Sequence, residues 1–263
     1  MGAARIAPSA AVARSLGLHS PAVTTLQQAA RAPSRGPEFW WRVLSPLLAL
    51  FLALIVSIFA FVVLTATSLS DAAVNVGAAF VGGLAIAGFS YALWAALPAA
   101  ERRDAIALVH SRRGALGMGI VIGIGIIIAS GAFLVLGTVV DPGLEDRLED
   151  TQVDVGDTPA LVVITVIALV VLAPLGEEML FRALLLRGLA ARIPFWWAAL
   201  ISTLLFTLAH PDATVGGVWP RLPGLIITGL ALAWLYRWRG YWAGVSAHAT
   251  VNLVAAVALI ASG

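Results

Sequence analysis

Two adjacent carboxylates and an arginine, Glu177, Glu178 and Arg182, interrupt an apolar stretch that opens at Ala160 and continues past Leu189. A charged side chain at the centre of a bilayer costs about 2.5–3.5 kcal/mol on insertion scales, so charges found there are paired, functional or both. On a helix, Glu178 and Arg182 lie one turn apart on the same face, in the acid-first order that favours an ion pair. Glu177 points about 100° away. We therefore expect Glu178 and Arg182 to form a buried pair and Glu177 to serve another purpose.

Two histidines and an asparagine lie in apolar segments further along the chain. His248 and Asn252 are four residues apart and share a helix face, and His210 closes another apolar segment with Phe206 one turn before it. With Glu177 they supply a general base and hydrogen-bond donors for a developing oxyanion. Alternatively, the carboxylate of Glu177 and the imidazoles of His210 and His248 could hold zinc with an open position for water. Either arrangement activates water, so the sequence indicates a hydrolase.

Two interpretations without hydrolysis stay open. Each polar group alone is consistent with hydrogen bonding between helices, worth about 0.6 kcal/mol on average, as in a non-catalytic membrane scaffold or immunity protein. Intramembrane carboxylates and histidines also build proton relays, as in a proton-coupled transporter. A transporter would more readily show a related pair of broken helices in its two halves. Here the ionisable groups within apolar segments are confined to the second half of the chain, which favours the hydrolase.

The composition is typical of a membrane protein. Of the 263 residues, 60% are hydrophobic and only 11% are charged, which predicts an all-α polytopic membrane protein. The absence of cysteine excludes disulfides and thiolate chemistry. We expect the partners to be the lipid bilayer and a membrane-bound substrate, with no nucleic acid.

We expect about seven transmembrane helices, with the catalytic bundle in the second half. They are predicted at residues 43–66, 73–97, 115–140, 160–189, 195–210, 222–236 and 241–260. Tryptophans cluster at the ends of these spans, as at a membrane interface. At 1.5 Å per residue, His210 would lie about 23 Å along the fifth span, whereas Glu177 lies near the middle of its helix. Tilt, or a deeper start of the fifth span, is needed to bring the two together.

The chain divides into three regions. Residues 1–40 are predicted to be a disordered cytoplasmic tail, with a transit peptide or a mis-assigned start as alternatives. Residues 41–159 hold the N-terminal transmembrane helices and an acidic loop at 141–158, and residues 160–263 hold the catalytic helical domain. With seven spans, all of the 16 arginines except Arg147 and Arg221 fall on one side. The positive-inside rule places that side, and the N-terminus, in the cytoplasm, and we expect a bacterial plasma membrane.

Three motifs in the second half resemble those of a known family. Glu177-Glu178-x-x-x-Arg182, Phe206-x-x-x-His210 and His248-x-x-x-Asn252 occur in that order, each on an apolar helix. This pattern is similar to the CPBP intramembrane proteases, also called ABI, which include CAAX-processing proteases and bacteriocin-processing or self-immunity proteins. The resemblance covers roughly residues 160–263. Ala183 departs from the glycine that many members have after the arginine.

The resemblance implies an endopeptidase that cleaves a membrane-embedded or lipid-anchored peptide or protein. It implies that Glu177 activates the attacking water with help from His210, and that His248 and Asn252 stabilise the oxyanion. It also implies that Glu178 and Arg182 support the site. The family has been described both as metalloproteases and as metal-independent glutamic proteases. Because the amide of Asn252 is a poor metal ligand and a good donor, we favour a site that requires no metal, with zinc as the alternative.

Overall fold

The computed structural model describes residues 37–107, 111–150, 154–210 and 221–262, and in these ranges helices joined by short turns and loops make up the chain, with no strand. The all-α prediction is therefore confirmed for this part of the chain, whereas most of the predicted tail at 1–40 lies outside the described residues. The first half contributes the helices α3 (Pro37–Thr65), α4 (Asp71–Ala95), α5 (Ala99–Ala105), α6 (Arg112–Val140) and α7 (Leu144–Asp150). The second half contributes α8 (Pro159–Val166), η1 (Ile167–Leu172), α9 (Ala173–Glu177), η2 (Glu178–Leu186), α10 (Arg187–Ala190), α11 (Phe195–Leu208), α12 (Arg221–Arg239) and α13 (Tyr241–Ser262).

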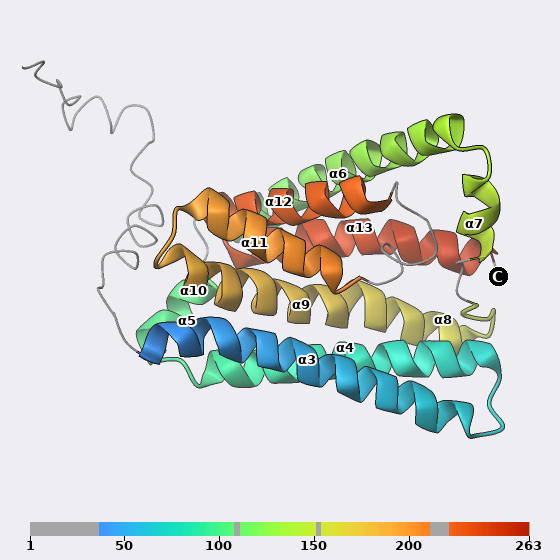
Figure 1. The fold of residues 1–263 in the computed structure, drawn as a ribbon, viewed down its shortest axis with the longest axis horizontal. Helices are drawn as coiled ribbons and strands as arrows, with labels where there is room; N and C mark the ends of the chain where they lie inside the picture. The colour runs from blue at the N-terminus through green and yellow to red at the C-terminus, as the bar shows by residue number, and fades with distance from the viewer. Residues whose placement is uncertain (1–36, 108–110, 151–153, 211–220, 263) are drawn as a thin grey trace, which may run out of the picture.

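The long helices lie side by side in one bundle (Figure 1). The start of α3, the short helix α5 and the joint between α10 and α11 lie at one end, and α7, the start of α8 and the C-terminus lie at the other. The predicted acidic loop at 141–158 contains the short helix α7 at this second end. Basic and acidic residues thus gather at opposite ends of the bundle.

Within the described ranges, five helical segments are long and apolar enough to cross a membrane, namely Trp40–Thr65, Asp71–Ala95, Arg112–Val140, Pro159–Ala190 and Tyr241–Ala261. The expected count of seven is not confirmed, because the two remaining long helices of the described chain fall short. Helix α11 has 14 residues and spans about 21 Å, less than the hydrocarbon core of about 30 Å. Helix α12 has 19 residues but carries arginines at both ends.

The short length of α11 accounts for the depth of His210. Counted at 1.5 Å per residue, His210 lies about 23 Å along the chain from Phe195, and Glu177 lies about 20 Å from Ala190. Both lengths run from the same end of the bundle (Figure 1). Helix α11 therefore stops part-way through the bundle, at the level of Glu177, and no special tilt is required.

The segment that carries the two glutamates is one continuous helical run from Pro159 to Ala190, widened twice into π-helical turns at η1 and η2. Each widened turn adds a residue to the turn and redirects the side chains that follow, and such turns are frequent at functional sites. A Cβ on Gly176 would lie 2.7 Å from the backbone nitrogen of Ala87, so this glycine allows α9 to approach α4 closely.

Small residues also join α6 to α13, which packs against this run. Gly119 and Gly123 on α6 are four residues apart, and a Cβ on them would meet the backbone oxygens of Ala243 and Ala247 on α13 at 2.5 and 2.8 Å. Without a hydrophobic driving force between helices in lipid, such close backbone packing is a main source of stability. It fixes α13, which carries His248 and Asn252, against the bundle.

Candidate active site

The two adjacent glutamates have different surroundings. Glu178 is 1% exposed and begins η2, where Met179 to Leu186 are also buried. Glu177 ends α9, has a side chain 15% exposed, and its buried Oε2 has no hydrogen-bond partner among the described residues. The structure therefore separates a fully enclosed carboxylate from one that faces a cavity.

Glu178 and Arg182 lie in contact one turn apart. Glu178 Oε1 lies 3.1 Å from Arg182 Nη1, and both side chains are 1% exposed. Arg182 also donates from Nη2 to the carbonyl of Gly229 on α12, at 3.4 Å. A Cβ on residue 244 would lie 2.8 Å from Glu178 Oε2, so Gly244 on α13 leaves the space that this carboxylate occupies.

Phe206 joins the pair to the histidines. The guanidinium of Arg182 lies 4.6 Å from the centre of the Phe206 ring, in a cation–π contact. The same ring lies 4.6 Å from the imidazole of His210 and 5.8 Å from that of His248, centre to centre. Phe206 is 1% exposed, so it forms an apolar wall between the arginine and the polar cavity.

A hydrogen bond to Glu178 orients the His248 ring. Its Nδ1 lies 3.1 Å from Glu178 Oε1. A carboxylate paired with arginine is ionised and can only accept, so Nδ1 carries the proton and donates. The other nitrogen, Nε2, lies 3.9 Å from Glu177 Oε2. Glu178 therefore selects the tautomer of His248 as well as pairing with Arg182.

His210 is oriented in the same way by the backbone. Its Nδ1 lies 2.7 Å from the carbonyl oxygen of Phe206, which can only accept, so this nitrogen also donates. Its Nε2 lies 3.9 Å from Glu177 Oε2. In their neutral forms both histidines thus present a lone pair towards the same carboxylate oxygen. Three acceptors that converge in this way call for a donor between them, and water is the simplest.

Glu177, His210 and Asn252 line a cavity of about 390 Å³. Its remaining walls come from α3, α4, η1, α9 and α13, and are mostly small or apolar: Leu50, Ala53, Leu54, Ser57, Ala79, Gly82, Gly83, Ile86, Ala168, Leu169, Ala173, Ala209 and Ala255. His248 is buried and does not line this cavity, but its Nε2 lies 3.9 Å from Oε2 of Glu177, which does. The structure thus brings together all four residues that the sequence assigned to catalysis.

Asn252 also has a structural contact that the sequence did not indicate. Its Nδ2 donates to the carbonyl of Leu169 at 2.8 Å. In η1 the N–H of Ala173 reaches back five residues to Ala168, so the next carbonyl, that of Leu169, would require the N–H of residue 174. Residue 174 is proline and has none. Asn252 supplies the missing donor.

Sequence reasoning missed two further groups that hold the widened helix. The Tyr241 hydroxyl donates to the Leu175 carbonyl at 2.8 Å, and the Ser202 hydroxyl donates to the Phe181 carbonyl at 2.8 Å. A buried carbonyl without a donor is costly, so these bonds stabilise the π-helical backbone beside the glutamates. Only the position of Pro174 hinted at unpaired carbonyls, and nothing in the sequence named their partners.

The donor set was tested as a zinc site. Zinc bonds of about 2.0 Å in tetrahedral geometry place two ligand atoms about 3.3 Å apart. The two Nε2 atoms each lie 3.9 Å from Glu177 Oε2, and the described residues contain no group of three histidine or acidic side chains arranged to hold a metal. As placed, the side chains do not fit a zinc ion.

One of the comparisons with known proteins finds a match, in the second half of the chain. Residues 159–254 match the family model described as Rce1-like, type II CAAX prenyl endopeptidase. The matched range spans all three motifs, and over this part of the chain it bears out the resemblance to the CAAX proteases. No curated protein and no solved structure matches the chain.

Proposed function

We propose that this membrane protein is an intramembrane endopeptidase in which Glu177 activates the attacking water, since residues 159–254 match the Rce1-like model of CAAX endopeptidases. The observation that carries the proposal is the unpartnered, buried Oε2 of Glu177, which faces the Nε2 atoms of two oriented imidazoles at the edge of a cavity. A proton acceptor held away from other donors is available to a water molecule.

The reaction is the hydrolysis of a peptide bond. Water bound between Glu177 and His210 gives one proton to the carboxylate, and its oxygen bonds to the substrate carbonyl carbon. The carbon–nitrogen bond then breaks, and the same proton passes to the leaving amine nitrogen. His210 is a fixed acceptor beside Glu177 because its Nδ1–H is held by the Phe206 carbonyl, and it assists by orienting the water.

We propose that His248 and Asn252 donate hydrogen bonds to the developing oxyanion. Nε2 of His248 can donate only when the ring is an imidazolium, because Nδ1–H is already directed at Glu178. Asn252 uses one amide hydrogen on Leu169 and retains the second for the substrate.

We propose that the mechanism needs no metal, on the strength of the ligand distances given above. Activity of the purified protein should survive exhaustive chelation in detergent. Loss of activity with chelator, followed by recovery with one equivalent of zinc, would contradict this part of the proposal while leaving the peptidase assignment intact.

The cavity walls indicate the class of substrate. They combine small side chains with leucines from helices that border the membrane, so they can receive an extended apolar segment. We propose a membrane-embedded or lipid-anchored peptide or protein as substrate. A non-catalytic role or proton-coupled transport has no comparable support from the geometry.

The proposed function is tested by comparing the membrane peptides of cells that carry the wild-type chain with those of cells that carry Glu177→Gln. The amide keeps the volume but accepts no proton, so cleavage should fall by about 10²–10⁴-fold. Glu145→Gln, which removes an exposed carboxylate on α7, is the matched control and should cleave normally. Unchanged peptides with Glu177→Gln, at equal protein level, would exclude the proposal.

For the topology we propose a seven-helix bundle in a bacterial plasma membrane, with the N-terminus in the cytoplasm. Helices α11 and α12 pack closely, since a Cβ on Gly229 would lie 2.5 Å from Thr203, and they enter and return at the same end of the bundle (Figure 1). Whether α11 and α12 each cross the membrane fully therefore does not change the side of the membrane on which the other connecting segments lie. We also propose residues 160–263 as the catalytic region and 41–159 as its helical cover.

A further inference from the structure

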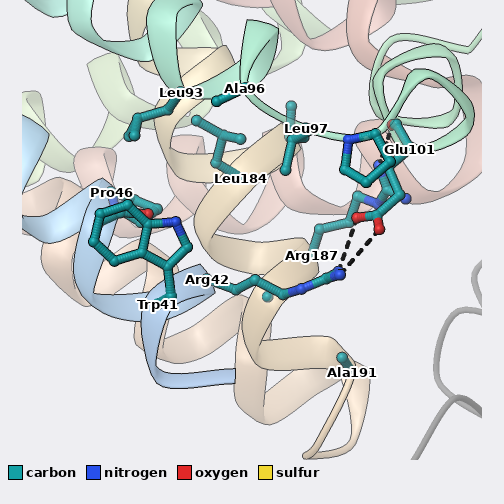
Figure 2. A pocket seen from close by; sticks show the side chains of 14 residues that line it. Trp41, Arg42, Pro46, Leu93, Ala96, Leu97, Glu101, Leu184, Arg187 and Ala191 are labelled. Atoms are coloured by element: carbon teal, nitrogen blue, oxygen red, sulfur yellow. Dashed lines mark hydrogen bonds and ion pairs between the residues drawn. The ribbon is translucent and has the colours of Figure 1, made fainter. Parts of the chain in front are cut away.

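A second and larger cavity, of about 650 Å³, lies at the end of the bundle where α3 begins and η2 passes into α10. We call it the interfacial cavity. Its lining comes from α3, α4, α5, η2 and α10 and includes Trp41, Arg42, Leu93, Glu101, Leu184 and Arg187 (Figure 2). None of the proposed catalytic residues lines it. Its volume falls within the range of about 300–1,000 Å³ that is usual for ligand pockets.

The position of the interfacial cavity decides what can reach it. Candidate spans begin at Trp40 and end at Ala95 and Ala190, so the cavity lies at the level where hydrocarbon gives way to headgroups. Trp41 is 64% exposed at its rim, as is usual for interfacial tryptophans. Leu93, Leu97 and Leu184 supply an apolar wall on the other side (Figure 2). The occupant must therefore be amphiphilic.

The charged groups of the cavity decide whether the headgroup of the occupant is anionic or cationic. Arg42 donates from both terminal nitrogens to the two oxygens of Glu101 at 2.9 Å, which neutralises both side chains. Arg187 donates from Nη1 to the backbone carbonyl of Glu101 at 2.9 Å. No carboxylate lies within ion-pair distance of Arg187 in the part of the chain that the structure describes. Since a guanidinium has five N–H donors, Arg187 keeps a positive charge and free donors at the cavity.

We propose that the interfacial cavity binds an anionic phospholipid from the surrounding leaflet. Its phosphate accepts hydrogen bonds from Arg187, and its acyl chain lies along Leu93, Leu97 and Leu184. Basic pockets between membrane helices recognise anionic headgroups by this chemistry. The site is independent of proteolysis, but Arg187 lies on the same helical run as Glu177, so a bound lipid joins α3 and α5 to the catalytic helix.

The test uses the full-length chain in detergent, titrated with short-chain phosphatidylglycerol or phosphatidylcholine, with bound lipid counted by native mass spectrometry. One phosphatidylglycerol should be retained, and it should raise the melting temperature by mass action, whereas phosphatidylcholine should not. Arg187→Gln should weaken retention about fivefold to tenfold, as expected for the loss of one interfacial arginine. Arg147→Gln, which also removes an arginine but one that pairs with Asp141 at the other end of the bundle, should bind normally.

Two further arms keep the test decisive. Ala96→Phe narrows the cavity without changing its charge, so it should expel the lipid even if Arg187→Gln folds poorly. Inorganic phosphate should not displace the bound lipid, because it lacks the acyl chain. Equal retention of the two lipids, full displacement by inorganic phosphate, or normal binding by both cavity variants would each overturn the proposal.

Discussion

The buried carboxylate of Glu178 has three neighbours that depend on it. It pairs with Arg182, accepts from His248 Nδ1, and fills the space left by Gly244. Oε2 of the preceding residue, Glu177, has no hydrogen-bond partner among the described residues. The helix places one acid in the protein interior and leaves the other at the cavity, so changes at the two positions should have different consequences.

Breaking the Glu178–Arg182 pair from one side should destabilise the fold. Glu178→Gln leaves a buried guanidinium without its counter-ion, at a cost of about 3–5 kcal/mol, and Arg182→Met should cost a similar amount. The combination Glu178→Gln with Arg182→Met should recover much of the melting temperature, measured by thermal unfolding in detergent. Activity should stay low in the double variant, because His248 has lost the carboxylate that orients it. Additive losses of stability would show that the two side chains are not coupled.

Gly244 gives a second test of the same carboxylate. A methyl group there would lie 2.8 Å from Glu178 Oε2, so Gly244→Ala should displace the carboxylate and with it the His248 ring. We expect a lower kcat with the protein still folded. Gly125→Ala on α6 is the control, since a Cβ there meets nothing within 4 Å and alanine should stabilise the helix by about 0.4–1 kcal/mol. Equal activity of the two variants would argue against the positioning role of Glu178.

At the scale of helices, the widened run from Pro159 to Ala190 depends on donors from its neighbours. Asn252, Tyr241 and Ser202 donate to carbonyls of Leu169, Leu175 and Phe181 respectively. Two of the three donors come from α13, whose register is set by close packing on α6. The position of Glu177 thus depends on α13, which lies outside the helical run that carries Glu177.

The relation between Asn252 and Pro174 can be tested by a double-mutant cycle. Asn252→Leu should leave the Leu169 carbonyl without a donor and lower the free energy of unfolding by about 1–3 kcal/mol. In a Pro174→Ala background the restored backbone N–H can serve that carbonyl, so the same change should cost less. Thermal unfolding of the four proteins measures the difference. If Asn252→Leu costs the same in both backgrounds, proline is not the reason for the asparagine contact.

The sequence predicted which side chains share a helix face, but not how deep each helix reaches. The four-residue spacings place Glu178 beside Arg182 and Phe206 beside His210, because helix periodicity is local. The end of α11 at Leu208 could not be predicted, since the apolar pattern continues to Ala209 and only packing decides the length used. The π-helical widening, and the roles of Tyr241 and Gly244, depend on contacts between distant segments.

At the scale of the whole molecule, charge follows the long axis of the bundle. Arginines gather where α3, α11 and α13 begin, and acids gather around α7 (Figure 1). The number of spans was harder to predict than this asymmetry. Helices α11 and α12 enter and return at the same end of the bundle (Figure 1), so the other loops keep their sides of the membrane whether or not this pair crosses. Sidedness is therefore a firmer prediction from sequence than the number of crossings.

The native chain has no cysteine, so single cysteines report sidedness cleanly. Glu145→Cys on α7 should react with a membrane-impermeant maleimide added outside intact cells. Arg103→Cys, which is also exposed but lies in α5 at the opposite end, should react only after the membrane is opened. The opposite pattern would invert the proposed orientation, and reaction of both sites from outside would exclude a membrane-spanning bundle.

The walls of the active-site cavity have a consequence for how this protein could diversify. The proposed catalytic residues lie within the matched segment 159–254, whereas the facing wall, with Ala53 and Ser57 on α3 and Ala79 and Gly82 on α4, lies before it. Chemistry and selectivity are thus inherited through different stretches of the gene. Exchange of the first two long helices between relatives could transfer a preference for a new substrate while the hydrolytic apparatus stays untouched.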